Sequence, residues 1–332
     1  MSSGLENLLV KTWHEKNGLA LFLRPVSWLY CLIVILRRGA YRLRLLRSTR
    51  LPVPVIVVGN LTVGGTGKTP MVIYLAELMK AKGYHPGIVS RGYKGKARSW
   101  PQQVRPDGDP VMVGDEAILI SRRSQCPMAV GPDRVAAAEA LMQYHDCDII
   151  ISDDGLQHYA LQRNIEIAVI DGTRRFGNGY CLPAGPLREP LSRLQSVDLK
   201  LTNGTPAEEE LAIRYQFDDL VSLQDDNMKQ ALKGLSGQTV HAVAGIGHPQ
   251  RFFDLLREQG LKVIEHSFPD HYHYFESDLE FDDDYPVIMT EKDAVKCFRF
   301  ATDNSWYLPI SLTIDDKFGN QLAELLESRQ QG

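Results

Sequence analysis

The stretch Gly64-Gly65-Thr66-Gly67-Lys68-Thr69 decides how this chain of 332 residues is expected to fold. An apolar run at 55–58 precedes it, and a run with helical character at 71–82 follows it. A strand, a glycine-rich turn and a helix start form a phosphate-binding loop, in which backbone N–H groups surround phosphate oxygens. Lys68 is expected to reach the β- and γ-phosphates, and the Thr69 hydroxyl is expected to bind Mg²⁺. The stretch therefore predicts binding of ATP or GTP.

Three positions narrow the class of nucleotide-binding protein. Thr62 stands where the usual pattern GxxxxGK[ST] has its first glycine, so a glycine-rich turn with a chance Lys-Thr pair is the alternative interpretation. Val63 stands where one subclass of P-loop ATPases, with the sequence KGGxGKT, has a signature lysine, so that subclass is not supported. The segment 290–293 (TEKD) does not match the Asn-Lys-x-Asp guanine-binding motif of GTPases. ATP is therefore favoured over GTP.

The composition indicates a globular protein of a reducing compartment. Hydrophobic residues make up 44% of the chain, which allows a sizeable core and, at this length, two domains. The formal net charge is -4, so there is no global signal for nucleic-acid binding. The five cysteines are scattered and form no CxxC pair, which indicates neither a zinc site nor a disulfide framework. A cytoplasmic location fits best.

The segment before the loop is basic and apolar. Its apolar run 26–36 would form a helix about 16 Å long, whereas a membrane-spanning helix needs about 20 apolar residues. Two interpretations remain for 17–50: a helix in the membrane interface with arginines on anionic headgroups, or a buried helix of a soluble fold. Trp28 and Tyr30 favour the interfacial helix. The arginines of this segment are Arg24, Arg37, Arg38, Arg42, Arg44, Arg47 and Arg50.

The rest of the chain predicts an α/β fold, because apolar runs rich in Ile and Val alternate with helical patterns. Strands buried on both faces explain why these runs show little alternation. We expect a P-loop NTPase-type, mostly parallel sheet flanked by helices, a smaller C-terminal α/β domain and an N-terminal amphipathic helix. The expected strands are 55–58, 88–90, 128–130, 148–151, 165–170, 199–201, 240–244, 263–264, 287–289 and 312–314. The expected helices are 68–82, 115–124, 132–145, 249–260 and 317–328.

A weaker pattern at 204–238, with surface-type acidic clusters, marks the expected domain boundary near residue 235. We therefore expect an N-terminal membrane-associating helical segment at 1–50. The P-loop domain is expected at 51–235, and the smaller α/β domain at 236–332.

Two pairs of carboxylates carry candidate chemistry. The apolar strand 148–151 leads to Asp153 and Asp154, which is the shape of a Walker B strand whose acid holds Mg²⁺. A strand followed by an Asp-Gly turn is the alternative. Asp115 and Glu116 open a helix-like stretch, where negative charge stabilises a helix N-terminus. The functional alternative makes one of them a general base or a Mg²⁺ contact in phosphoryl transfer.

Cationic and histidine-rich loops supply further candidates. Arg91 follows a strand in a glycine-rich loop, and Arg188 lies between two prolines; each is either an anion contact or a solvated surface cation. The segment 268–274 is rich in His and Tyr, and one of its histidines could reach the P-loop domain across a cleft. Its spacing matches no recognised zinc pattern.

Taken together, several segments resemble the tetraacyldisaccharide 4'-kinase family, the lipid A 4'-kinases of Gram-negative bacteria. The resemblance runs from about residue 17 to near the C-terminus, and that family also carries Thr at the position of Thr62. The segments are Gly59-Asn60, Gly64-Gly65-Thr66-Gly67-Lys68-Thr69-Pro70, Ser90-Arg91-Gly92-Tyr93, Gly114-Asp115-Glu116, Gly131-Pro132-Asp133-Arg134, Asp153-Asp154-Gly155-Leu156-Gln157-His158, Gly185-Pro186-Leu187-Arg188-Glu189 and Asp270-His271.

The resemblance implies ATP-dependent phosphorylation, with Mg²⁺, of the 4'-hydroxyl of tetraacyldisaccharide 1-phosphate, which yields lipid IVA in lipid A biosynthesis. It implies a peripheral or monotopic protein at the cytoplasmic face of the inner membrane, and it strengthens the interfacial interpretation of 17–50. The expected partners are the lipid substrate and the membrane surface. Neither nucleic acid nor an obligate protein partner is expected.

The resemblance also assigns roles. Asp115 accepts the proton of the sugar hydroxyl, and His271 pairs with Asp115 and orients it; His271 is preferred to His273 because it directly follows Asp270. Lys68 acts on the phosphates with the rest of the loop: Thr62, Gly64, Gly65, Thr66, Gly67 and Thr69. The expected Mg²⁺ residues are Thr69, Glu116, and Asp153 or Asp154. The expected substrate contacts are Arg91, Arg134, Gln157, His158 and Arg188.

Two alternative functions stay open at this point. A membrane-associated P-loop ATPase switch would hydrolyse ATP without forming a phosphorylated lipid. A soluble kinase of a small metabolite would bury 17–50 within its fold. Because His271 belongs to the second domain, the kinase interpretation predicts that catalysis requires domain closure.

Overall fold

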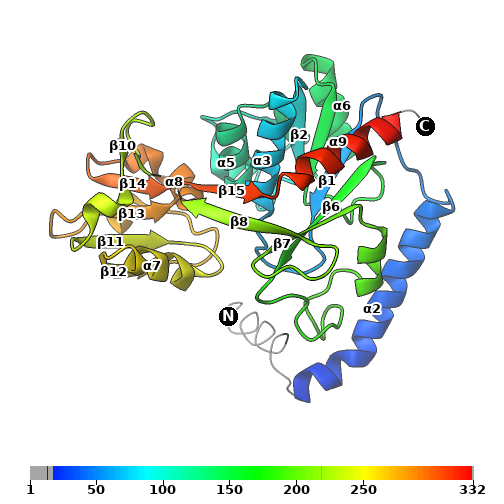
Figure 1. Cartoon of the computed structure of the whole chain (residues 1–332), viewed down its shortest axis with the longest axis horizontal. Coiled ribbons are helices and arrows are strands. Elements are labelled where there is room, and N and C mark those ends of the chain that lie inside the picture. Colours follow the sequence, from blue (N-terminus) through cyan, green and yellow to red (C-terminus); the bar gives the residue numbers. More distant parts are fainter. Residues whose placement is uncertain (1–12, 14–17, 218, 331–332) are drawn as a thin grey trace.

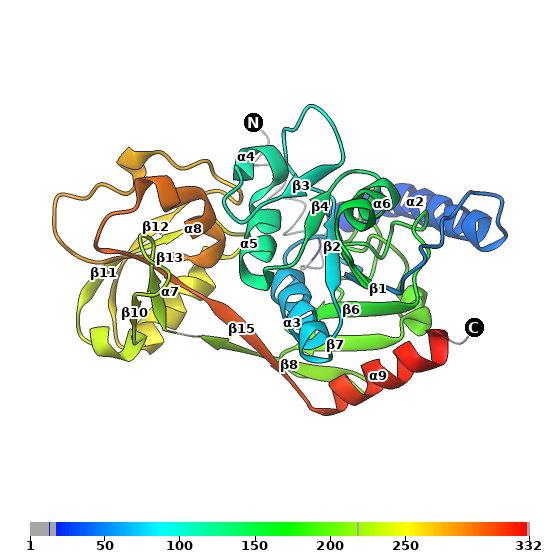
Figure 2. The ribbon, with the colours of Figure 1, turned by 90° about the horizontal axis from the view of Figure 1, so that it is seen from above.

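The computed structural model describes residues 13, 18–217 and 219–330. Within these residues, two α/β units and a long N-terminal helix make up the chain (Figure 1). The helix lies against the larger unit, and the smaller unit lies at the opposite end of the molecule (Figure 2). The predicted α/β class, with a mostly parallel sheet flanked by helices, is confirmed.

The larger unit is built around β1, which pairs in parallel with β5 on one side and β6 on the other. Every residue of these three strands is buried, as expected for parallel strands covered on both faces. The strands of the larger sheet lie side by side in this order: β15 (Ile310–Ile314), β8 (Leu211–Phe217), β7 (Leu199–Asn203), β6 (Ile165–Asp171), β1 (Val55–Gly59), β5 (Ile149–Asp153), β2 (Pro86–Ser90), β4 (Met128–Val130) and β3 (Gln102–Val104).

Helices cover both faces of this sheet, and alternate residues of β1 face the two layers. Ile56 and Val58 share one hydrophobic core with helices α3, α5 and α9, whereas Val55 and Val57 share the other with helix α6. Asp133 caps the N-terminus of helix α6, and its carboxylate accepts hydrogen bonds from two backbone N–H groups of the first turn. The helices are α3 (Lys68–Ala81), α4 (Pro110–Val113), α5 (Asp115–Ser124), α6 (Arg134–Tyr144) and α9 (Lys317–Gln330), with a 3₁₀ turn η1 (Leu191–Ser196).

The smaller unit has its own sheet, in which β14, β13, β11 and β12 are parallel and β9 and β10 are antiparallel at one edge. Its order is β10 (Lys229–Gln230), β9 (Leu220–Ser222), β14 (Ser305–Leu308), β13 (Val287–Thr290), β11 (Thr239–Ala244) and β12 (Lys262–Ser267). Its helical elements are α7 (Pro249–Glu258), α8 (Glu291–Cys297), η2 (Leu232–Leu235), η3 (Glu276–Asp278) and η4 (Phe298–Phe300).

The chain leaves the larger unit for the smaller one and then returns to the larger unit. The expected division at residue 235 does not include this return. Strand β8 leads into the smaller unit, and β15 returns beside it as an antiparallel partner in the larger sheet (Figure 2). Helix α9 then packs on the larger unit, because Phe318 and Leu322 are buried in the same core as α3. We therefore revise the proposed division and assign 220–308 to the smaller unit and 310–330 to the larger one.

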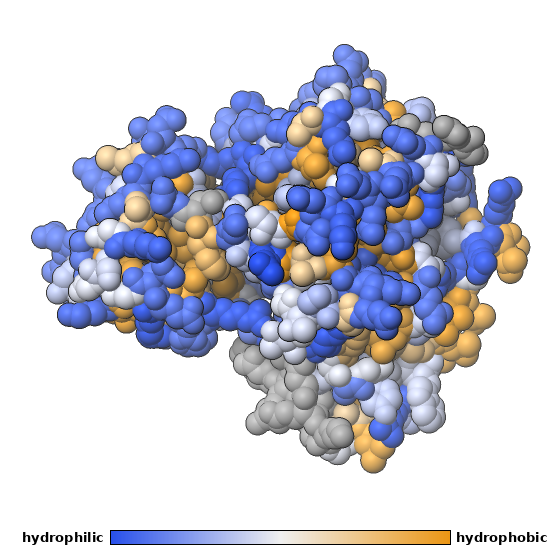
Figure 3. All heavy atoms as spheres, viewed as in Figure 1, coloured by the Kyte–Doolittle hydropathy of each residue, from blue (hydrophilic) through white to orange (hydrophobic). Residues whose placement is uncertain are grey.

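Helix α2 (Gly18–Arg42) is longer than the apolar run suggested, since it continues through Pro25 for 25 residues. One face is anchored: the Ser27 hydroxyl donates to the Cys181 carbonyl at 2.7 Å, and the Tyr30 hydroxyl donates to the Arg188 carbonyl at 3.0 Å. The opposite face exposes large apolar side chains, which Figure 3 shows along this edge of the molecule. Among the described residues, α2 alone is long and apolar enough to cross a membrane, by length and composition. The short length expected from 26–36 was therefore wrong.

The return of the chain to the larger unit leads to a stability prediction. Phe318 is 0% exposed, and its ring centroid lies 6.1 Å from that of Tyr74 in α3. Phe318→Ala should lower the free energy of unfolding by about 3 kcal/mol, since a buried cavity replaces the ring. Urea unfolding followed by circular dichroism measures this loss.

The matched control is Phe275→Ala, because the Phe275 side chain is 56% exposed. This control should change the free energy of unfolding by less than about 1 kcal/mol. Equal losses in the two variants would contradict the placement of α9 in the core of the larger unit.

Candidate active site

One cavity of about 1350 Å³ joins the P-loop to both the smaller unit and helix α2. Its walls include the carboxyl ends of β2, β5 and β7, which is where open α/β sheets bind ligands. Tyr30, Val34 and Arg37 of α2 line one side, and His248, Arg251 and His271 of the smaller unit line another. A nucleotide and a second substrate can therefore meet within one cavity.

The P-loop has the backbone that a phosphate cradle needs. Gly64 and Gly67 have φ values of 109° and 87°, which favour glycine, and a Cβ on Gly67 would lie 1.7 Å from the Tyr215 hydroxyl. The buried Thr66 hydroxyl has no hydrogen-bond partner among the described residues. The Lys68 ammonium donates to the Asn60 amide oxygen at 3.2 Å. These groups fit a phosphate, which would accept hydrogen bonds from them.

Asp153 and Asp154, at the end of β5, differ in their partners. One oxygen of Asp153 accepts from the Ser90 hydroxyl at 2.9 Å, and the other is buried without a partner among the described residues. Both oxygens of Asp154 accept from Arg188, at 2.8 and 2.9 Å, and Lys68 lies 3.5 Å away. Burial, followed by the charges of Asp154 and Glu116, raises the pKa of Asp153 to about 6. A buried acid with an unpaired oxygen is suited to a cation.

Mg²⁺ fits this part of the cavity as an ion shared with phosphates. No group of three acidic, His or Cys side chains among the described residues is arranged to hold a metal by itself. Mg²⁺ bound beside nucleotides commonly uses one or two protein ligands and completes its shell with phosphate oxygens and water. Thr69, Asp153 and Asp154 line the cavity together and supply suitable oxygens.

Asp115 and His271 meet across the two units. Asp115 opens α5 in the larger unit, and the His271 Nδ1 lies 2.9 Å from both of its carboxylate oxygens. The His271 backbone has a φ of 63°, an unfavourable value for a residue with a side chain, which often marks a functional position. The predicted pairing of His271 with Asp115 therefore has its geometry in the structure, and no contact between His273 and Asp115 is described.

Opposing effects set the charge of Asp115. Burial raises the pKa of its carboxyl group, but the hydrogen bond from His271 and the charges of Lys292, His271 and Lys296 outweigh burial and lower it to about 2. Because the folded pKa is below the ordinary value of 3.8, ionised Asp115 stabilises the fold above about pH 4. This contribution is lost as the pH falls from about 4 towards 2. At neutral pH the carboxylate is available to accept a proton.

Lys292 is a site residue that the sequence analysis did not identify. From the first turn of α8, its ammonium lies 3.0 Å from Glu116, 3.1 Å from Asp270 and 3.5 Å from the His271 Nε2. Burial lowers the pKa of Lys292, but the charges of Glu116, Asp115 and Asp270 outweigh it and raise the pKa above its ordinary value. Its sequence signal is the TEKD segment at the end of a strand, where a lysine lies between two acids.

The expected substrate contacts all line the cavity but differ in their freedom. Arg91 is exposed, whereas Arg134 is 5% exposed and donates to the Pro132 and Asp154 carbonyls. Burial and the charge of Arg134 lower the pKa of His158 to about 4, so this imidazole is neutral at pH 7. Gln157 donates to Glu189 at 3.0 Å. These contacts leave Arg91 the most accessible cation of the set.

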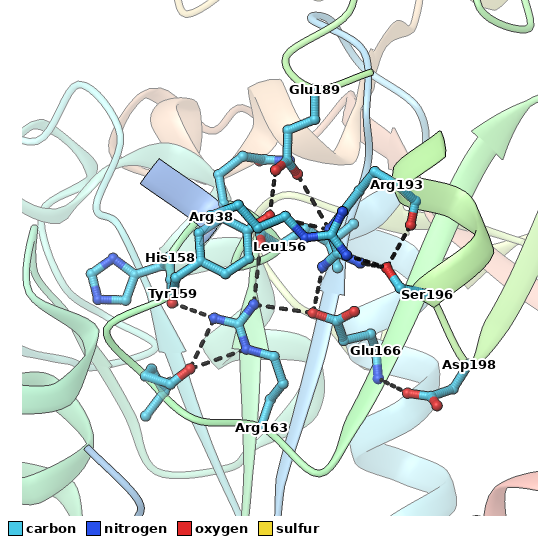
Figure 4. A network of polar contacts seen from close by, with 12 residues as sticks. Arg38, Leu156, His158, Tyr159, Arg163, Glu166, Glu189, Arg193, Ser196 and Asp198 are labelled. Carbon is cyan, nitrogen blue, oxygen red and sulfur yellow. Dashed lines mark hydrogen bonds and ion pairs between the residues drawn. The ribbon is translucent and has the colours of Figure 1, made fainter. Parts of the chain in front are cut away.

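A buried polar network fixes the loop that carries Arg188 (Figure 4). Arg193, which is almost fully buried, lies 3.6 Å from the buried carboxylate of Glu189. Arg193 and Arg38 of α2 both donate to the Ser196 hydroxyl at 2.7 Å. Networks of this kind are rigid when their groups are satisfied. Helix α2 is therefore coupled to the wall of the cavity beside the P-loop.

The Asp115–His271 contact leads to a prediction about charge. His271→Ala should raise the pKa of Asp115, because it removes the hydrogen bond that contributes most to lowering it while burial persists. Carbon NMR titration of protein labelled at Asp carboxyl groups measures this pKa, and Asp115→Asn assigns the signal. His273→Ala is the matched control and should leave the signal unchanged. An unaltered Asp115 pKa in His271→Ala would contradict the contact.

Comparison with known proteins agrees with this site. The family model described as tetraacyldisaccharide-1-P 4'-kinase matches residues 19–327. A protein of Nitrosococcus oceani named tetraacyldisaccharide 4'-kinase is 52% identical over 325 residues, covering 98% of this chain and 96% of its own. One of Coxiella burnetii with the same name is 45% identical, covering 95% and 94%.

A solved structure agrees as well. The crystal structure of LpxK from Aquifex aeolicus in complex with ATP matches with a TM-score of 0.80 and 29% identity, covering 93% of this chain and 99% of that one. The resemblance expected from the motifs is confirmed along nearly the whole chain: it belongs to the tetraacyldisaccharide-1-phosphate 4'-kinase family.

Proposed function

We propose that this chain transfers the γ-phosphoryl group of ATP to the 4'-hydroxyl of tetraacyldisaccharide 1-phosphate and so forms lipid IVA. The observation that carries the proposal is the single cavity in which the P-loop, the Asp115–His271 pair and helix α2 meet. Membership of the 4'-kinase family supports the same reaction. The alternative of a P-loop switch gives no reason for a carboxylate–histidine pair beside the phosphate loop.

In the proposed mechanism, Lys68 and the loop N–H groups hold the β- and γ-phosphates of ATP. The 4'-oxygen attacks the γ-phosphorus, the bond to the β,γ-bridging oxygen breaks, and Asp115 takes the hydroxyl proton. His271 holds Asp115 in position through its Nδ1. A positioned base contributes roughly 10²–10⁴-fold to such a step, and the alignment of the reactants supplies much of the rest.

We assign Mg²⁺ to Asp153 and Thr69 and give Asp154 and Glu116 supporting positions. The unpaired buried oxygen of Asp153 supports this choice, because Asp154 is already held by Arg188 and Glu116 by Lys292. When bound, Mg²⁺ neutralises charge on the phosphate oxygens. Arg188 already pairs with Asp154. We propose that Arg188 also contacts phosphate.

We further propose that α2 places the cavity at the cytoplasmic face of the inner membrane. Leu29, Ile33 and Leu36 are exposed on this helix, while Tyr30 and Arg37 line the cavity from its other side. An apolar face next to arginines suits a helix in the membrane interface. The acyl chains of the substrate can then stay in the membrane while its sugar enters the cavity.

The direct test of the function is incubation with ATP and tetraacyldisaccharide 1-phosphate in mixed micelles. A bisphosphorylated lipid, detected by mass spectrometry, is the expected product. ATP hydrolysis without that product would favour the switch and overturn the proposal.

The base assignment predicts that Asp115→Ala lowers kcat by about 10²–10⁴-fold with little change in ATP affinity. The reason is that Asp115 acts on the sugar hydroxyl, whereas the P-loop binds the nucleotide. Steady-state kinetics and calorimetric titration with ATP separate the two effects. Lys68→Ala is the contrasting variant and should lower both kcat and the affinity for ATP. A parallel loss of ATP binding in Asp115→Ala would contradict the assignment of Asp115 as the base.

The membrane proposal predicts that Ile33→Glu lowers binding to anionic vesicles by about tenfold, since a charge enters the apolar face. Vesicle co-sedimentation measures this binding. Activity towards a short-chain, water-soluble acceptor should change little in the same variant. Glu139→Gln, on the exposed surface of α6, is the control. Unchanged sedimentation of Ile33→Glu would exclude α2 as the membrane contact.

A further inference from the structure

Helix α5 touches the smaller unit at both of its ends. Its first turn carries Asp115 and Glu116, which contact His271 and Lys292. Its last turn carries two arginines, at positions 122 and 123. Residues seven positions apart lie two turns apart on the same helix face. One face of α5 is therefore the surface against which the smaller unit docks.

Two ion pairs form the distal contact. The Arg123 Nη1 lies 2.9 Å from both carboxylate oxygens of Glu291, and these side chains are 24% and 11% exposed. The Arg122 guanidinium lies 3.9 Å from the centroid of the Phe298 ring and pairs with Asp226. All three partners belong to the smaller unit. The Arg123–Glu291 pair is partly buried, so solvent screens it less than the exposed Arg122–Asp226 pair.

The smaller unit transmits this contact to His271. Glu291 begins α8, directly before Lys292, whose ammonium lies 3.1 Å from Asp270 in the loop that carries His271. The same helix start is fixed by Asp293, which accepts hydrogen bonds from the Thr290 hydroxyl at 2.6 Å and from the Gly245 N–H at 2.8 Å. A shift of α8 along α5 would therefore move the imidazole of His271.

The charges at the two ends of α5 are arranged in opposite order. At the proximal end, α5 supplies the acid Glu116 and the smaller unit supplies the cation Lys292. At the distal end, α5 supplies the cation Arg123 and the smaller unit supplies the acid Glu291. If the unit reversed its direction on α5, like charges would face each other, which is unfavourable. The pattern therefore specifies one orientation, and the spacing of the two pairs along α5 specifies its register.

We propose that Arg123 and Glu291 are positioning residues for phosphoryl transfer, which set the register of the smaller unit on α5 and so bring His271 to Asp115. Arg122 supports them through Phe298 and Asp226. Arg123, Asp226 and Phe298 do not line the cavity, so they act through the smaller unit rather than on the substrates. Glu291 does line the cavity, and its pairing with Arg123 is therefore tested by restoring the pair in the double variant. The proposal rests on the proposed function only where its readout is the reaction rate.

The test is a charge exchange. Arg123→Glu and Glu291→Arg should each lower kcat by at least about tenfold, while the KM for ATP stays within about threefold. The double variant R123E/E291R restores the pair in the opposite sense and should regain kcat to within about threefold of the parent protein. Arg123→Gln and Glu291→Gln give smaller losses in the same direction and serve if a charge reversal prevents folding.

Arg257→Glu in α7 is the matched control. It makes the same charge change, but the partners of Arg257, Asp254 and Glu265, lie within the smaller unit. Its kcat should equal that of the parent protein. A general effect of surface charge would lower kcat in this variant too, and that result would overturn the proposal.

A second readout does not depend on activity. Spin labels at Glu139→Cys and Glu258→Cys, in a Cys31→Ala background, report the distance between the units by pulsed EPR. The single reversals should broaden the distance distribution, and the double variant should narrow it again. If the parent protein makes no bisphosphorylated lipid, the proposed function fails while this distance still tests the docking. An unaltered distribution and kcat in Arg123→Glu, or losses that the double variant does not restore, would overturn the proposal.

Discussion

The contact between Asp115 and His271 is the constraint on which the site depends. It joins the first residue of α5 to a loop of the other unit, and the His271 backbone adopts a costly left-handed conformation to make it. Such strain persists only where the surroundings hold it, and here Lys292 and the docking face of α5 do so. The paired strands β8 and β15, which link the units, keep the smaller unit beside the P-loop.

Two buried acids of the site differ because their neighbours differ. Cations and a hydrogen bond surround Asp115 and lower its pKa to about 2, whereas burial and neighbouring acids raise that of Asp153 to about 6. Environments that separate two carboxyl groups in this way indicate separate tasks. An ionised Asp115 suits a proton acceptor next to a hydroxyl, and Asp153, whose second buried oxygen has no hydrogen-bond partner among the described residues, suits a cation site. The start of α5 and the end of β5 thus hold two acids with different pKa values beside one cavity.

Local sequence patterns predicted most of the fold and the part of the candidate site that belongs to the larger unit. The P-loop, the Walker B strand and the α5 carboxylates lie in continuous segments whose spacing reports their geometry, and their elements form as expected. Strand β8, with its polar residues, gave too little signal within 204–238. Lys292 was missed because its role comes from contacts with residues 176 and 22 positions away, which no local spacing encodes. The pairing of His271 with Asp115 was expected only through resemblance, for the same reason.

The most direct test of the account is a double-mutant cycle on the transfer step, with Asp115→Asn, His271→Ala and the two combined, measured as single-turnover rates at saturating ATP. If Asp115 and His271 act as one unit, the double variant is no slower than the slower single variant, to within about threefold. Losses that multiply would show that the two residues act independently, and would contradict the claim that their contact across the units organises the site.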